Sequence, residues 1–97
     1  MAKESQYQSG LVKRIKERFP ESVVLKTDPS QMQGIPDLLV LNKDRWALLE
    51  VKQSKEAKKR PNQEYYVDKF DSMSFSSFIF PENEEEVLNA MERTFKS

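Results

Sequence analysis

The sequence contains no cysteine and no histidine. Their absence excludes disulfides, zinc sites built on thiolate or imidazole, cysteine nucleophiles and histidine general bases. Any metal chemistry in this chain must therefore use oxygen ligands. No hydrophobic run approaches the ~18 residues of a membrane-spanning helix, and no signal-peptide pattern opens the sequence. We therefore expect a soluble, intracellular protein of the cytoplasm, with no membrane partner.

Net charge is also absent, because sixteen basic residues balance sixteen acidic ones in a chain of 97 residues. That length predicts a single domain spanning residues 1–97. The charges are unevenly distributed along the chain. Residues 43–60 carry seven Lys or Arg against three Asp or Glu, and residues 82–97 carry five Glu against two basic residues. The neutral total hides a basic centre and an acidic C-terminal part.

A β-hairpin is the clearest element that the sequence predicts. Two apolar runs, residues 38–41 and 46–51, flank the segment Asn42-Lys43-Asp44-Arg45, which has the composition of a turn. With the middle two residues of that segment at the tip, antiparallel pairing brings residues at equal distances from the tip opposite each other. Asp37 then faces Glu50 at the open end of the hairpin.

The two facing carboxylates are unusual in such a hairpin. Side chains alternate between faces along a strand, so Glu50 and Lys52 point the same way. Facing carboxylates repel each other unless a positive charge lies between them. A divalent cation would satisfy both, since Mg²⁺ is commonly held by one or two carboxylates with water and phosphate oxygens. Lys52 would then stand beside the metal, able to hold a water molecule or a phosphate oxygen.

Pro36-Asp37 followed by Glu50-Val51-Lys52 resembles the PD-(D/E)xK motif of the restriction-endonuclease-like nuclease superfamily. With Gly34 and Ile35 before the hairpin and Gln63 after it, the chain is similar to the small VRR-NUC and Holliday-junction-resolvase-like branch, which is common in phages. The resemblance covers roughly residues 4–87.

The expected fold class is α/β. Apolar periodicity predicts helices at residues 4–19 and 61–72, strands at 22–26, 38–41, 46–51 and 75–80, and a last helix that begins with a capping box at Asn83 and Glu86. This order gives a mixed four-stranded sheet flanked by helices. It is the αβββαβ core of the restriction-endonuclease-like fold, which the resemblance implies independently, with a C-terminal helix added.

The resemblance implies an endonuclease that hydrolyses DNA phosphodiester bonds with Mg²⁺ or Mn²⁺. Asp37, Glu50 and the Val51 carbonyl are the expected metal ligands. Lys52 would orient the attacking water or stabilise the transition state, and Gln63 would contact the metal-site water or a phosphate. Glu4 has two interpretations: a carboxylate at a helix N-terminus, or the first-helix glutamate that reaches the metal site in related resolvases.

The polar segment after Lys52 leaves directly from the acidic cluster. We therefore expect Lys55, Lys58, Lys59 and Arg60 to contact the DNA backbone, which positions nucleic acid without reading its sequence. Cutting both strands of a duplex or a branched junction takes two active sites, so we expect a homodimer.

Several alternatives remain open at this point. Asp28 is either a turn residue or a metal ligand, and Tyr65 and Tyr66 are either packing residues or stacking platforms for bases. The chain as a whole is alternatively a catalytically silent nucleic-acid-binding module on a nuclease fold. In the other alternative it is a small α/β protein-interaction domain with a structural ion-pair cluster.

Overall fold

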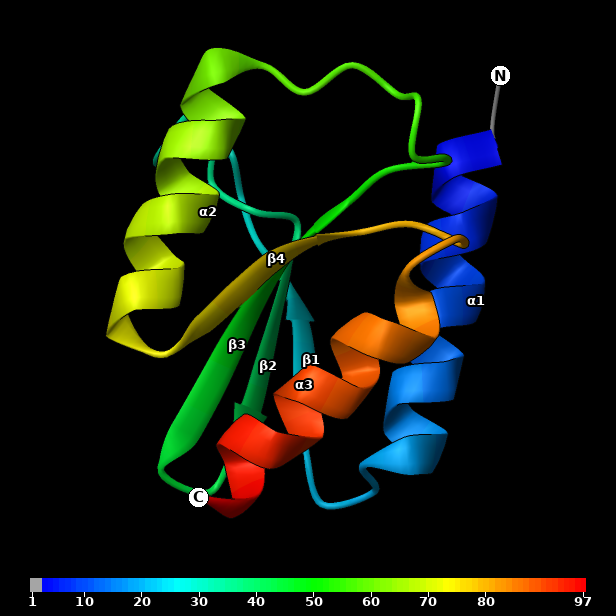
Figure 1. Cartoon of the computed structure of the whole chain (residues 1–97), viewed down its shortest axis with the longest axis vertical. Coiled ribbons are helices and arrows are strands. Elements are labelled where there is room, and N and C mark those ends of the chain that lie inside the picture. The colour runs from blue at the N-terminus through cyan, green and yellow to red at the C-terminus, as the bar shows by residue number, and fades with distance from the viewer. Residues whose placement is uncertain (1–2) are drawn as a thin grey trace.

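The computed structural model describes residues 3–97, which form three helices and four strands (Figure 1). In chain order they are α1 (Lys3–Arg18), β1 (Val23–Lys26), β2 (Leu38–Asn42), β3 (Arg45–Val51), α2 (Pro61–Met73), β4 (Phe75–Ile79) and α3 (Glu84–Lys96). Each predicted element is present, with ends that differ by one or two residues. Within residues 3–97, no helix is both long and apolar enough to cross a membrane.

The strands form one sheet in the order β1-β2-β3-β4, in which β4 runs parallel to β3 and the other neighbours are antiparallel. The mixed four-stranded α/β sheet predicted from the sequence is therefore confirmed. In the β2–β3 hairpin Leu38 pairs with Leu49 and Asn42 with Arg45, which is the predicted register. Lys43 at the tip takes the left-handed conformation, with a φ of 56°, as tight hairpin turns require.

Helices cover the two faces of the sheet unequally. Alternate residues of β3, namely Ala47, Leu49 and Val51, join the buried core together with apolar side chains of α1 and α3. The other face packs against α2, where Trp46 of β3 meets the edge of Phe70 at 6.2 Å between ring centroids. Figure 1 shows α1 and α3 on one side of the sheet and α2 on the other.

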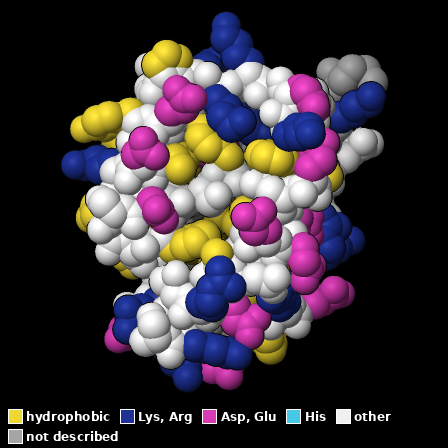
Figure 2. Space-filling model, in the orientation of Figure 1, with side chains coloured by type: hydrophobic (Ala, Val, Ile, Leu, Met, Phe, Trp, Pro, Cys, Tyr) yellow, Lys and Arg dark blue, Asp and Glu magenta, His cyan; other side chains and the backbone are white. Residues whose placement is uncertain are grey.

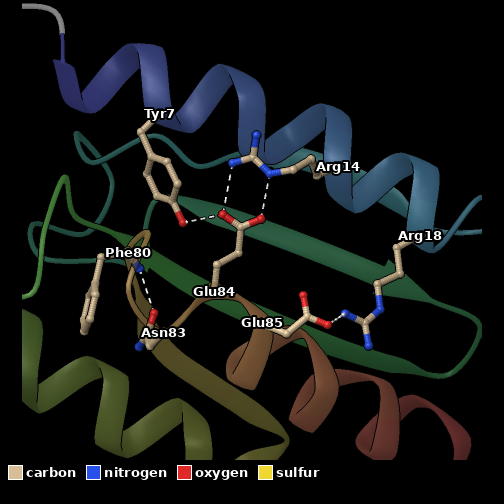
Figure 3. A network of polar contacts seen from close by, with 7 residues as sticks. All are labelled: Tyr7, Arg14, Arg18, Phe80, Asn83, Glu84 and Glu85. Atoms are coloured by element: carbon tan, nitrogen blue, oxygen red, sulfur yellow. Dashed lines mark hydrogen bonds and ion pairs between the residues drawn. The ribbon is translucent and has the colours of Figure 1, made fainter.

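A polar cluster fastens α1 to α3 (Figure 3). Arg14 donates to both carboxylate oxygens of Glu84, at 2.6 and 3.0 Å, and the Tyr7 hydroxyl donates to the same carboxylate at 2.8 Å. Burial, followed by the hydrogen bond to Glu84 and its charge, raises the pKa of Tyr7. Two-point Arg–carboxylate pairs are among the stronger and more directional contacts in proteins. This cluster therefore links α1 to the first turn of α3.

One expectation, about helix capping, is wrong, and one edge of the sheet is less covered than the rest. Val23 and Leu25 of the edge strand β1 are 51% and 47% exposed, because α2 packs on β3 and β4. Asn83 does not form a capping box with Glu86: its side-chain oxygen accepts from the Phe80 N–H at 2.8 Å. Asn83 thus closes the β4–α3 turn, and its side chain makes no capping bond to the helix.

Gly34, in the loop before β2, has a φ of +96°, a backbone conformation that L side chains rarely adopt. A Cβ atom there would also lie 2.8 Å from the side-chain nitrogen of Asn62, at the start of α2. Gly34 therefore permits both the turn and the close approach of this loop to α2. Gly10, inside α1, has ordinary helical geometry, and a Cβ there would meet only the flexible end of the Arg14 side chain.

We predict opposite effects for two glycine-to-alanine substitutions. Gly34→Ala should destabilise the fold by roughly 1–2 kcal/mol or more, because it forces a left-handed backbone on alanine and displaces Asn62. Gly10→Ala should be neutral or stabilising by up to about 1 kcal/mol, because alanine favours the helix. Urea unfolding of both variants measures the difference, and equal effects would contradict the role given to Gly34.

Candidate active site

The candidate site lies at the open end of the β2–β3 hairpin, beside the start of α2. A pocket of about 250 Å³ opens there. Its lining comes from three segments: the loop before β2, the hairpin itself and the start of α2. The lining residues are Pro29, Gln33, Gly34, Ile35, Asp37, Glu50, Arg60, Asn62 and Gln63. In Figure 1 this end of the sheet lies near the top, under the linker that joins β3 to α2.

Asp37 is held by backbone contacts on both sides. Its carboxylate oxygen Oδ2 accepts a hydrogen bond from the Val51 N–H at 2.8 Å. On the other side, Thr27 donates its N–H to the Asp37 carbonyl at 3.0 Å and its hydroxyl to the Pro36 carbonyl at 2.7 Å. The carboxylate is therefore fixed by the end of β3, and its backbone by the residue that follows β1.

Gln63 links the other two polar residues of the motif. Its side-chain N–H donates to Glu50 Oε2 at 3.1 Å, and its oxygen accepts from Lys52 Nζ at 2.9 Å. The same oxygen accepts from the Arg60 N–H at 3.0 Å. Glu50 and Lys52 are only 3% and 8% exposed, so their charges need such partners. The structure thus brings Asp37, Glu50, Lys52 and Gln63 together, and their catalytic roles stay predictions.

Glu50 is the most perturbed carboxyl group of the site. Burial raises its pKa to about 8, and the charge and hydrogen bonding of Asp37 add to that rise, while the charge of Lys52 opposes it. Glu4, in the first turn of α1, contributes a further small rise through its charge. The protein therefore holds Glu50 where its negative charge is costly without a cation nearby.

The donor set fits a hard divalent cation. Asp37 and Glu50 supply two carboxylates, and the adjoining Val51 carbonyl is a further oxygen of the kind that Mg²⁺ accepts. The raised pKa of Glu50 is relieved when a cation lies between the pair. Among residues 3–97, no three Asp, Glu, His or Cys side chains gather closely enough to hold a metal. Glu4 therefore makes no third carboxylate of a preformed cluster, and both interpretations of it remain open.

The four cations predicted to contact DNA differ in their surroundings. Lys55, Lys58 and Arg60 are exposed and form no ion pair within the described part of the chain. Lys59 instead lies over the rings of Phe78 and Phe80, 5.2 and 5.5 Å from their centroids. In Figure 2, Lys and Arg side chains lie along the upper rim, with acidic side chains between them. Arg60 lines the pocket, and Lys59 helps to hold the linker on Phe78 and Phe80 at the end of β4.

Asp28 is a turn residue, since its side chain accepts from the Ser30 N–H at 2.9 Å and it does not line the pocket. Tyr66 stacks on Phe70, as a packing residue does, whereas Tyr65 is 59% exposed.

Sequence reasoning did not single out Asn62, although it adjoins Gln63. Thr27 and Gln33 belong to the loop that leads into the hairpin, which the sequence marks only as a whole as a candidate for substrate contact.

The element order and the acidic pair at the hairpin's open end define an α/β domain of the nuclease-fold class. No family model matches the sequence, and no curated protein matches it either. Solved structures do match, among them two VRR_NUC domains. A "VRR_NUC domain" is 26% identical, with a TM-score of 0.69 over 93% of this chain and 95% of the other. A "VRR_NUC domain protein" is 12% identical, with a TM-score of 0.69 over 97% of this chain and 88% of the other. The second likeness shows the fold alone. The predicted resemblance to VRR-NUC nuclease domains is thereby confirmed over nearly the whole chain.

The raised pKa of Glu50 predicts that stability falls as pH rises. Because the folded-state pKa of about 8 exceeds the ordinary value, the folded protein binds the proton more tightly than the unfolded chain. The resulting stabilisation is complete below about pH 4.5 and is lost as the pH approaches 8, by on the order of a few kcal/mol.

Urea unfolding across this pH range in EDTA measures the loss. Glu50→Gln should remove most of it, because glutamine resembles the protonated acid. The exposed glutamate Glu86 on α3 supplies the matched control, Glu86→Gln. A wild-type stability that stays flat between pH 5 and 8 would contradict the prediction.

Proposed function

We propose that the chain is a metal-dependent endonuclease that hydrolyses phosphodiester bonds in DNA. The observation that best supports this is the series of hydrogen-bonded polar side chains at the site. Asp37 faces Glu50, and Gln63 joins Glu50 to Lys52 through hydrogen bonds of 3.1 and 2.9 Å. Burying Glu50 and Lys52 beside the half-buried Asp37 costs free energy that a purely structural site would avoid. The likeness to VRR-NUC domains supports the same class of activity.

In this proposal Asp37, Glu50 and the Val51 carbonyl hold one or two Mg²⁺ or Mn²⁺ ions. A bound ion lowers the pKa of a water molecule and offsets the charge that develops on the scissile phosphate. Lys52 donates to that water or to a phosphate oxygen. Gln63 keeps the lysine ammonium pointing at the site by accepting its hydrogen bond, and gives up that contact when a substrate oxygen replaces it.

DNA is the proposed substrate because a phosphodiester backbone matches the free cations at the rim. The side chains of Lys55, Lys58 and Arg60 are exposed and form no ion pair among residues 3–97, and Arg60 lines the pocket. Contacts of this kind position a strand by charge. A branched DNA, such as a four-way junction, is the substrate that the resemblance implies, and plain duplex is the alternative.

A cleavage assay with matched lysine variants tests the proposal. The panel contains a labelled four-way junction, a flap, a single strand and a linear duplex, each in Mg²⁺, Mn²⁺ or EDTA. We expect cutting in either metal and none in EDTA. Lys52→Ala should lower the rate by about 10²-fold or more, and Asp37→Asn and Glu50→Gln should also abolish cutting. Lys13→Ala, at an exposed position on α1, is the control.

Thermal unfolding supplies a second measurement that does not depend on activity. Mg²⁺ should raise the melting temperature of the wild type at pH 8, where repulsion between the two carboxylates is strong. It should not raise the melting temperature of Glu50→Gln. DNA binding of equal strength by wild type and Lys52→Ala, with no cutting of any substrate, would favour the silent binding module instead.

We further propose that the active form is a homodimer. One domain carries one candidate active site, and cutting both strands of a duplex needs two active sites. Sedimentation velocity at the concentration of the cleavage assay should show a species of twice the chain mass. A stable monomer that cuts four-way junctions at nanomolar concentration would overturn this part of the proposal.

A further inference from the structure

The pocket has a wall whose hydrogen-bond donors are unused. It consists of Gln33, in the loop before β2, and of Arg60 and Asn62, at the start of α2. Within residues 3–97, the side chains of Gln33 and Asn62 make no hydrogen bond, and the Arg60 guanidinium makes no ion pair. Across the pocket, the carboxylates of Asp37 and Glu50 both accept hydrogen bonds. The two sides of the pocket thus differ: one is anionic and hydrogen-bonded within the protein, and the other is rich in donors that no other described residue engages.

Asn62 is held in place by packing. Its amide nitrogen lies 2.8 Å from where a Cβ of Gly34 would be, so the side chain rests directly on the glycine backbone. It is half-buried between the loop and the helix. Packing therefore restricts the rotamers of Asn62 without engaging its two N–H donors, which lowers the entropy lost when a ligand binds to them.

The ligand that suits this wall is an acceptor with several oxygens. Primary amides offer two donors each and a guanidinium offers five, and the facing carboxylates repel any anion that lacks compensating donors. A phosphodiester has two non-bridging oxygens that only accept, and binding to such a charged acceptor strengthens each hydrogen bond.

We propose that Asn62, together with Gln33 and Arg60, binds the non-bridging oxygens of a backbone phosphate in the DNA strand that crosses the pocket. This inference rests on the proposed nuclease function and assigns Asn62 as a positioning residue. Its contact is to the backbone, so it acts equally on every DNA sequence. The contact is made in the bound substrate and in the transition state alike, so it affects KM more than kcat.

The test compares three asparagine variants on two linear duplexes of unrelated sequence. Dissociation constants are measured by fluorescence anisotropy with Ca²⁺ in place of Mg²⁺, and KM and kcat with Mg²⁺. Asn62→Ala should raise the dissociation constant and KM about tenfold on both duplexes, with kcat changed less than about twofold. Asn62→Asp should weaken binding further, because it points a carboxylate at the phosphate. Asn89→Ala, at an exposed position on α3, is the matched control and should leave all three values unchanged.

Each other outcome has a definite meaning. If the wild type binds and cuts DNA and Asn62→Ala does so equally well, the inference is overturned while the nuclease proposal stands. The inference also fails if the effect of Asn62→Ala differs more than about tenfold between the two duplexes, since that would indicate a base contact. If Asn62→Ala lowers the melting temperature as well as the affinity for DNA, the role of Asn62 is structural. A wild type that neither binds nor cuts DNA removes the nuclease function and this inference together.

Discussion

The pairing register of the β2–β3 hairpin is the constraint on which the rest of the site depends. Lys43 adopts a left-handed conformation at the tip, and from there each ladder pair follows, up to Leu38 opposite Leu49. The next position outward brings Asp37 to Glu50. A slip of one residue would turn Glu50 into the apolar core and expose Leu49. The apolar side chains of the hairpin therefore enforce the placement of its charges.

Burial of Glu50 then dictates what surrounds it. Glu50 is only 3% exposed and faces Asp37. The cost of burying its charge is offset either when it takes up a proton or when hydrogen-bond donors and a cation surround it. Gln63 supplies one donor, and because it also accepts from Lys52, it keeps the ammonium close without letting it form a direct ion pair with Glu50. A direct pair would hold the lysine against the carboxylate. The glutamine leaves the ammonium free of that ion pair, as the proposed contact of Lys52 with a substrate oxygen requires.

Sequence reasoning recovered what the chain encodes locally. The two apolar runs and the turn composition between them predicted the hairpin, and therefore the meeting of Asp37 with Glu50. It could not recover contacts set by the packing of separate segments. The approach of Gly34 to Asn62 depends on where the loop after β1 crosses α2, and the exposure of Val23 and Leu25 depends on how far α2 extends across the sheet. Asn83 was misassigned because a side chain that caps a helix and one that closes a turn present the same sequence pattern.

The distribution of charge explains how a chain of zero net charge presents a basic rim. The acidic residues of α3 are largely used within the protein: Glu84 binds Arg14 and Tyr7, and Glu92 binds Arg18 and Lys96. The Arg14–Glu84 and Arg18–Glu92 pairs join α1 to α3 on the face of the sheet opposite α2, and Figure 3 shows the first of them. The α1–α3 cluster thus holds the helices together and engages these two glutamates away from the pocket. The linker cations Lys55, Lys58 and Arg60 are exposed and form no ion pair among residues 3–97, so they keep their charge available to a polyanion.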